Sequence, residues 1–193
     1  MRVSRAQFLA LELEAHALLA DVPLRDVTAI DLPGGGDTRT VTDVQALLRE
    51  DVRASTSSLV RALFGARRLL GRVFGWDSES HARSRSSFLH RLSDDLRTRS
   101  VVPPGTAQGP FTLLYVLERE SLAEARNATV HAFMCSALEK TAAGYRLYWG
   151  VYVKPVSWLT PVYMATIEPF RRFVVYPSIF RGIRRAWIEH YGS

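Results

Sequence analysis

The chain of 193 residues is poor in cysteine, in lysine and in long apolar runs, and each shortage argues against a class of protein. Its single cysteine, Cys135, cannot form an internal disulfide and has no partners for a structural zinc site, which fits a reducing compartment. The apolar stretch from Phe8 to Leu19 contains Glu12 and Glu14 and lacks the pattern of a signal peptide. The apolar run from Val156 to Ile167 is shorter than the ~20 residues that a transmembrane helix needs, and Glu168 and two arginines follow it. The sequence therefore predicts an unprocessed cytoplasmic protein without a membrane span.

Lysine is almost missing, because 23 of the 25 basic residues are arginine. The formal net charge of +6 is concentrated between residues 53 and 100, where ten arginines stand against four acidic residues. Such charge can attract nucleic acid, but neither a recognition motif nor an alternation of aromatic and basic residues accompanies it. A nucleic-acid partner is therefore not favoured, and a GC-rich coding bias explains the arginine excess more simply.

The remaining composition is ordinary for one globular domain, with 47% hydrophobic and 23% charged residues. Apolar residues at helical spacing predict an N-terminal helix over 5–20, and a short strand follows over 26–32. We therefore expect a helical extension over 1–25 and a single domain over 26–193. Within this domain the sequence predicts two helices, 42–48 and 57–74, and a polar excursion over about 77–109 anchored by Phe88, Leu92 and Leu96.

From residue 111 the apolar residues recur at every second position, which predicts successive antiparallel strands with short connections. The predicted strands are 111–118, 122–126, 129–139 and 145–153. Alternation assigns one uncharged set of side chains to the interior and places Arg146, Tyr148 and Tyr152 in solvent. The interior set is Phe111, Leu113, Tyr115, Leu117, His131, Phe133, Cys135, Tyr145, Leu147, Trp149 and Val151.

The last segment is predicted to cover that interior face, because apolar residues recur at helical spacing from Tyr163 to Trp187. Three prolines remove backbone donors within this segment, so the helix is expected to be interrupted, with its longest piece over 177–190. These prolines are Pro161, Pro169 and Pro177.

Several segments of the second half also carry a family resemblance. They are Asn127-Ala-Thr-Val-His131, Gly144-Tyr-Arg-Leu-Tyr-Trp149, Tyr152-Val-Lys-Pro155, Tyr163-Met164, Pro169-Phe-Arg-Arg172, Val175-Tyr-Pro177 and Arg184-Arg-Ala-Trp187. Together they resemble a bacterial family of domains of unknown function, which is similar to the START-like (SRPBCC) helix-grip superfamily. The resemblance implies an α+β helix-grip fold, in which a curved antiparallel sheet wraps around a long, proline-interrupted C-terminal helix and leaves a cavity between them. A helix-grip sheet has six or seven strands, so one or two more are expected within 77–109. The family has no established activity, so no functional residue carries over.

Three functions remain open, and binding of a small hydrophobic or amphipathic ligand is the leading one. A lipid, a polyketide-like compound or an isoprenoid would occupy the cavity between sheet and helix. Its predicted lining residues are Tyr115, His131, Phe133, Trp149, Tyr163 and Phe170. Ordinary core packing is the plain alternative for this aromatic group.

The second function is an enzyme of the cyclase or hydrolase kind, with His131 in the cavity as acid or base. The nearest carboxylates, Glu118, Glu120 and Glu124, lie around an adjacent turn, but no set of nucleophile, base and orienting residue can be assembled. A non-enzymatic role is therefore favoured, and a hydrogen-bonded core histidine is the plain alternative. The five histidines show no metal-ligand spacing, and no cofactor motif is present.

The third function is a peripheral membrane or protein-interaction module that uses the basic residues of the tail. The predicted surface residues are Arg171, Arg172, Arg181, Arg184 and Arg185. The plain alternative is the solvated back of a helix whose apolar side packs on the sheet.

Overall fold

The computed structural model describes residues 4–54, 86–126, 130–155, 165, 173 and 175–192. Their helices are α1 (Arg5–Leu9), α2 (Glu14–Leu18), α3 (Val41–Ala54), η1 (Phe88–Arg91), α6 (Asp94–Arg99) and α8 (Tyr176–Tyr191). Their strands are β1 (Leu24–Pro33), β2 (Ala107–Gln108), β3 (Phe111–Val116), β4 (Glu120–Arg126), β5 (Val130–Thr141) and β6 (Gly144–Pro155). The predicted helix over 57–74 lies outside the described residues, as do Pro161 and Pro169. None of the described helices is long and apolar enough to cross a bilayer.

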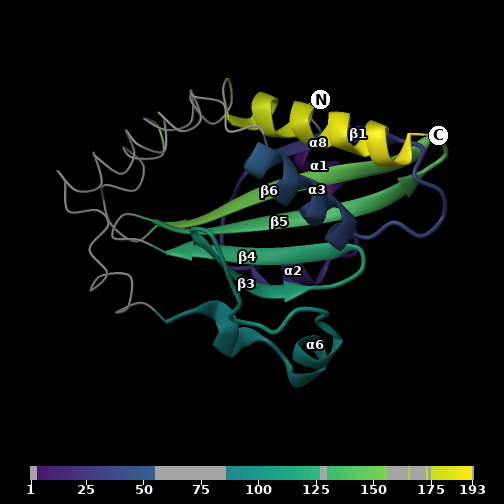
Figure 1. Ribbon diagram of the computed structural model, residues 1–193. Helices are drawn as coiled ribbons and strands as arrows, with labels where there is room; N and C mark the ends of the chain where they lie inside the picture. Colours follow the sequence, from purple (N-terminus) through teal and green to yellow (C-terminus); the bar gives the residue numbers. More distant parts are fainter. Residues whose placement is uncertain are drawn as a thin grey trace.

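A six-stranded antiparallel sheet in the order β1-β6-β5-β4-β3-β2 forms the centre of the fold (Figure 1). The predicted α+β class, with an antiparallel sheet packed against a C-terminal helix, is confirmed. The sixth strand, β2, lies inside the polar excursion, where an additional strand was expected. In the same segment Phe88, Leu92 and Leu96 are buried, which confirms them as its apolar anchors.

Both faces of this sheet are buried beneath helices. We call the first face the α8 face, because α8 and α3 pack on it (Figure 1). Its core comprises Leu32, Val41, Val44, Leu47, Leu138, Tyr145, Leu147, Trp149, Phe180, Ile183 and Trp187. The indole N–H of Trp187 donates to the carbonyl of Pro33 at 3.0 Å, which fixes α8 on the end of β1.

We call the opposite face the α2 face, because the N-terminal helices cover it together with η1 and α6. Its core includes Phe8, Ala15, Leu19, Phe88, Leu92, Leu96, Leu114, Tyr115, Leu122, Phe133, Cys135, Tyr148 and Tyr152. Residues 5–20, expected as a single helix, form α1 and α2 with a break between them.

This two-sided burial corrects the predicted assignment of faces. Phe133 pairs with Tyr152 and Ser136 with Trp149, so odd-numbered residues of β5 share a face with even-numbered residues of β6. Tyr148 and Tyr152 were assigned to solvent, yet they are only 4% and 3% exposed. The physical reason is the two-residue turn between β5 and β6, because it pairs odd with even positions and so reverses the parity of the face.

Phe8 holds the N-terminal segment on the sheet. Its ring is fully buried over Gly150 of β6, where an added Cβ would lie 2.5 Å from the ring. The two ring nitrogens of His16 contact the hydroxyl of Tyr152 at 2.9 Å and the carbonyl of Phe8 at 3.1 Å. Phe8 and His16 therefore fix the position of the chain between α1 and α2.

Replacing Gly150 with alanine is expected to lower the free energy of unfolding by about 1 to 3 kcal/mol, because the new methyl group overpacks the site of Phe8. Urea unfolding measures the change. In a Phe8→Leu background the cost of the same substitution should fall below roughly 1 kcal/mol, since the ring that it strikes is gone. Equal costs in both backgrounds would show that the strain arises elsewhere.

Candidate functional site

Strand β4 places two glutamates on the α2 face, where charged side chains are costly to bury. Glu120 and Glu124 are 4% and 1% exposed. Residues at alternating positions of a strand point to one side, so both side chains face the same core with Leu122 between them, their Cα atoms about 13 Å apart. Burying an ionised carboxylate requires a cation or several hydrogen bonds, or else the group takes up a proton. The two residues meet this requirement in different ways.

Glu124 is fully engaged by its surroundings. Its Oε2 lies 2.9 Å from Nε2 of His131 and accepts the backbone N–H of Phe88 at 3.1 Å. Its Oε1 accepts the hydroxyl of Ser87 and lies 3.4 Å from Nε of Arg126. Burial alone would raise the pKa of Glu124, but the hydrogen bonds from His131, Ser87 and Phe88 outweigh it and lower the pKa. Glu124 is thus an ionised link between the sheet and the start of η1.

His131 meets a carboxylate, which is half of the arrangement that an acid–base role requires. Its ring lies 4.3 Å from that of Phe133 and 5.1 Å from that of Phe88, and the residue is buried. Within the described part of the chain it lines neither of the two surface hollows considered below. A general acid or base must reach its substrate. These contacts therefore match the plain alternative, a hydrogen-bonded core histidine.

Replacing Glu124 with alanine would leave Ser87, His131 and the amide of Phe88 without their acceptor. The free energy of unfolding at neutral pH is expected to fall by about 3 to 5 kcal/mol, as when one partner of a buried pair is removed. Chemical denaturation measures this loss. The exposed Glu118 supplies a control, because Glu118→Ala should change stability by less than about 0.5 kcal/mol. Similar values for the two variants would contradict the linking role of Glu124.

A groove of about 710 Å³ opens beside the other glutamate. The chain between α1 and α2, residues 10–14, lines it together with the β3–β4 turn at 117–120 and residues 137–139 of β5. Arg99, the last residue of α6, and Val101 complete the lining. Segments from four parts of the sequence therefore meet at this hollow.

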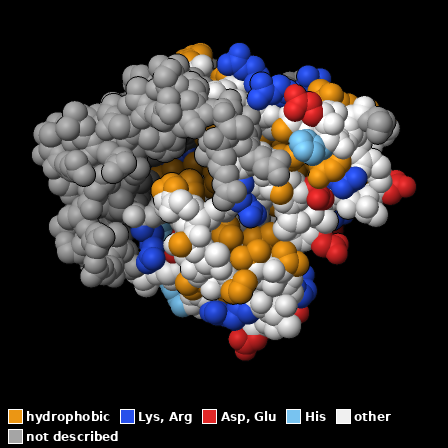
Figure 2. Space-filling view, in the orientation of Figure 1, with side chains coloured by type: hydrophobic (Ala, Val, Ile, Leu, Met, Phe, Trp, Pro, Cys, Tyr) orange, Lys and Arg blue, Asp and Glu red, His pale blue; other side chains and the backbone are white. Residues whose placement is uncertain are grey.

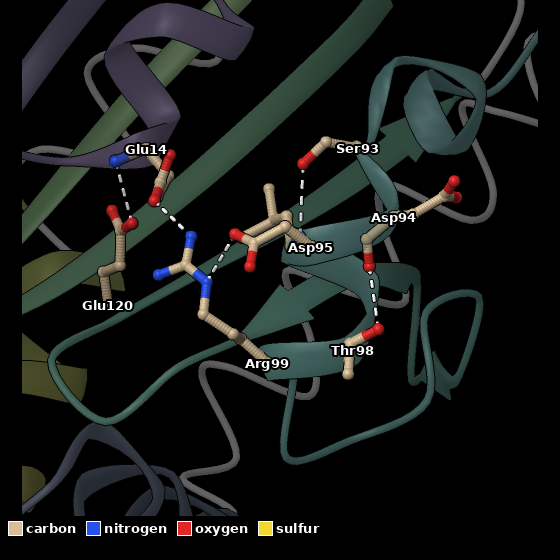
Figure 3. Close-up of polar contacts among 8 residues, drawn as sticks. Glu14, Ser93, Asp94, Asp95, Thr98, Arg99 and Glu120 are labelled. Carbon is tan, nitrogen blue, oxygen red and sulfur yellow. Dashed lines mark hydrogen bonds and ion pairs between the residues drawn. The ribbon is translucent and has the colours of Figure 1, made fainter.

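Glu120 lines this groove with half of its carboxylate in use. Oε1 accepts the backbone N–H of Glu14 at 2.9 Å and so caps α2, whose N-cap residue Leu13 offers no side-chain acceptor (Figure 3). Oε2 is buried without a partner at hydrogen-bond distance among the described residues, and so is the hydroxyl of Tyr115, although the two groups lie near enough for each to shift the pKa of the other. Figure 3 shows that the guanidinium of Arg99 is held by the carboxylate of Glu14 and by Asp95. The described contacts therefore pair Arg99 with Glu14 and Asp95 instead of Glu120.

The surroundings of Glu120 change its protonation. Burial raises the pKa of Glu120 to about 7, although the backbone amides of Glu14 and Ala15 act in the opposite direction. Burial also raises the pKa of Tyr115 and of Cys135 on the neighbouring strands, so both remain neutral. Near neutral pH the Glu120 side chain is thus divided between acid and carboxylate, the range in which a group can both hold and release a proton.

The raised pKa of Glu120 predicts a pH-dependent cost to stability. The pKa of Glu120 is 4.5 in the unfolded chain and about 7 in the folded protein. Between these two pH values the folded protein therefore binds more protons at this site than the unfolded chain does. The stabilising contribution is therefore present below pH 4.5 and is lost as the pH rises to about 7. Glu120→Gln stays neutral and keeps an acceptor for the Glu14 amide, so between about pH 5 and about pH 8 it should gain on the order of 2 to 3 kcal/mol over the wild type. Urea unfolding at both pH values measures this, and a parallel pH dependence of the two proteins would contradict it.

The structure separates the residues predicted to line one cavity. Tyr115, His131 and Phe133 lie on the α2 face, whereas Trp149 lies on the α8 face. Tyr163 and Phe170 lie outside the described residues. Trp149 packs against Tyr176 and Phe180 of α8 at ring separations of 6.1 and 5.1 Å, and its indole N–H has no partner among the described residues.

In the part of the chain that the structure describes, side chains of the α8-face core pack between the sheet and α8, where the cavity was expected. The groove beside Glu120 belongs to the other side of the sheet. From the sequence, Glu120 was named only as one of the carboxylates around the turn near His131. A stronger signal was its alternation with Leu122 and Glu124, which puts two charges on one side of an apolar strand.

The basic residues predicted to form a binding surface are described in part. Arg181, Arg184 and Arg185 are exposed along α8. Figure 2 shows Lys and Arg side chains along the upper edge of the molecule. With Ile188 and Glu189 they border a shallow hollow of about 360 Å³. Arg171 and Arg172 lie outside the described residues. The apolar side of α8 is used by the sheet, which matches the plain alternative of a solvated helix back.

Among the described residues, no group of three or more His, Cys, Asp or Glu side chains is arranged to hold a metal ion.

Comparison with known proteins gives a family but no activity. A sequence model of the family described as "Protein of unknown function (DUF2867)" matches residues 18–178. No curated protein sequence matches the chain. Among solved structures, the chain is similar to the di-domain ARO/CYC StfQ from the steffimycin biosynthetic pathway, with 10% sequence identity and a TM-score of 0.42. The match covers 93% of this chain and 56% of that one, so this chain spans little more than half of its length.

Proposed function

Since the chain belongs to the DUF2867 family of proteins of unknown function, its activity has to be argued from its own residues, and we propose that it binds a small amphipathic molecule in the groove beside Glu120. The observation that carries the proposal is the buried Oε2 of Glu120, which has no hydrogen-bond partner among the described residues. An unsatisfied buried polar atom costs roughly 1 to 3 kcal/mol. A bound molecule with a hydrogen-bond donor removes that cost.

The shape of the groove suits such a ligand. Its volume of about 710 Å³ falls within the range typical of small-molecule sites. Apolar side chains supply much of its lining and can cover a hydrocarbon or ring portion of the ligand. They are Ala10, Leu11, Leu13, Val101, Leu117, Ala137 and Leu138. Val101 is 60% exposed, so a ligand in the groove would cover an apolar side chain that otherwise faces water.

The proposed ligand therefore has one polar end at Glu120 and an apolar body against residues 10–13 and Val101. Lipids, isoprenoids and polyketide-like compounds of small size meet these two requirements. The site lies on the α2 face. Of the residues predicted to bind the ligand, Tyr115 lies near it, because its hydroxyl and the carboxyl group of Glu120 affect each other's pKa.

A second candidate function is acid–base catalysis on the same bound molecule. It is supported by Glu120, whose pKa of about 7 suits proton transfer at neutral pH and which lines the groove. His131, the residue expected in this role, lacks access to the groove. Proton exchange from a bound ligand that stops in Glu120→Gln while binding persists would favour catalysis over simple binding.

Filling the groove should abolish binding. Ala10 is exposed and lines the groove, so the indole of Ala10→Trp would occupy the ligand's place, whereas Ala142→Trp lies at the tip of the β5–β6 hairpin and serves as the control. Native mass spectrometry of the purified protein, followed by organic extraction, is expected to show a discrete small-molecule adduct in the wild type and in the control. In Ala10→Trp the bound fraction should fall about tenfold or more.

Two outcomes would overturn the proposed function. An adduct that persists unchanged in Ala10→Trp would place the ligand outside the groove. An empty wild-type protein that also fails to bind an apolar fluorescent dye in competition with amphipathic compounds would show that the groove binds no ligand of this class.

A further inference from the structure

We propose that the polar end of the ligand is a cation, a protonated amine, and that Glu120 is its counter-ion. This inference rests on the proposed function of the groove and adds the chemical class of the group that the groove recognises. Three observations carry it: the charge of the lining, the hydrogen bonds of the Glu120 carboxylate, and the pairing of Arg99 with other acids.

The lining of the groove is acidic in a protein whose net charge is +6. Five glutamates line it, against two arginines. The glutamates are Glu12, Glu14, Glu118, Glu120 and Glu139, and the arginines are Arg99 and Arg119. A concave surface of one sign concentrates ligands of the opposite sign and repels those of its own. Cationic ligands are therefore favoured here and anionic ones are disfavoured.

Arg99 does not cancel this charge at Glu120, because it is paired with other acids. The guanidinium of Arg99 bonds the carboxylate of Glu14 and, at 2.8 Å from its Nε, the carboxylate of Asp95 (Figure 3). A guanidinium shared between two carboxylates leaves the pair of acids with a surplus negative charge. The described ion pairs contain none that joins Glu120 to a basic side chain.

The geometry of Glu120 suits a donor that arrives from the groove. Oε1 is used by the amide of Glu14, and Oε2 is left as a buried acceptor. A neutral hydroxyl could satisfy Oε2, but a charge-assisted hydrogen bond from an ammonium group is roughly twice as strong. An ammonium also has further N–H donors, and the buried hydroxyl of Tyr115 lies near this carboxyl group. An amine therefore suits Oε2 better than an alcohol does.

The ionisation of Glu120 makes the inference testable by pH. An ammonium group stabilises the ionised form of Glu120. When Glu120 is protonated, binding of the amine is therefore coupled to release of that proton. Other titratable or charged groups interact with Glu120 or lie next to it: Glu14 of α2, Arg99 of α6, Tyr115 of β3, Cys135 of β5 and Tyr152 of β6. A variant at Glu120 isolates the contribution of its own carboxyl group.

The experiment compares three probes of equal chain length, octylamine, 1-octanol and octanoate, by isothermal titration calorimetry. At about pH 8 octylamine is expected to bind the wild type at least about tenfold more tightly than the other two. Its affinity should fall about 30-fold between about pH 8 and about pH 5.5, as protonation of Glu120 competes with the ligand. Glu120→Gln should lose both the preference for the amine and most of the pH dependence. Glu189→Gln, at an exposed residue of α8 outside this lining, is the control and should keep both.

The outcomes separate this inference from the proposed function. If 1-octanol or octanoate binds as tightly as octylamine and Ala10→Trp abolishes that binding, the groove is a ligand site but its ligand is not a cation. A pH dependence that survives in Glu120→Gln would overturn the role of Glu120. If none of the three probes binds, or if binding is unchanged in Ala10→Trp, the function proposed for the groove fails as well.

Discussion

Burial of the sheet on both faces is the constraint on which the rest of the structure depends. Helices α3 and α8 cover one face, and α1, α2, η1 and α6 cover the other. The central strands β4, β5 and β6 therefore have little solvent-facing side, and a charged residue within them must be paired, protonated or bound to something else. Glu120 and Glu124 show two responses to this constraint on one strand. The same face and the same residue type lead to opposite shifts of pKa, because the neighbours differ.

The contrast between the two glutamates separates structure from function. Glu124 has its acceptors filled by Ser87, Phe88 and His131, so it holds η1 against the sheet and has no capacity left for a ligand. Glu120 uses one oxygen to cap α2 and keeps the other unpartnered at the groove. Packing of Phe8 over Gly150 fixes the chain that forms the groove wall. The site therefore depends on a contact made by a residue that does not line it.

Much of the architecture could be predicted from local patterns. The spacing of apolar residues predicted the antiparallel strands from 111 onward and the C-terminal helix from Pro177, and the turn residues predicted their connections. The predicted lining residues do not all lie together. Tyr115, His131 and Phe133 share one face of the sheet, and Trp149 lies on the other. One parity was carried across the whole sheet, and the two-residue turn before Gly144 reverses it. A bulge in β3, where the pairing shifts between Leu113 and Tyr115, breaks the alternation again.

The sequence by itself determined the periods of its strands and helices, because side-chain alternation is a property of each segment alone. It also determined that a histidine and several carboxylates lie close to one another along the chain. Only the tertiary structure decided which faces meet, since register and bulges act between strands. It alone decided the state of Glu120 as well, because desolvation depends on what packs around a group. The amide that this carboxylate caps belongs to Glu14, more than a hundred residues away in sequence.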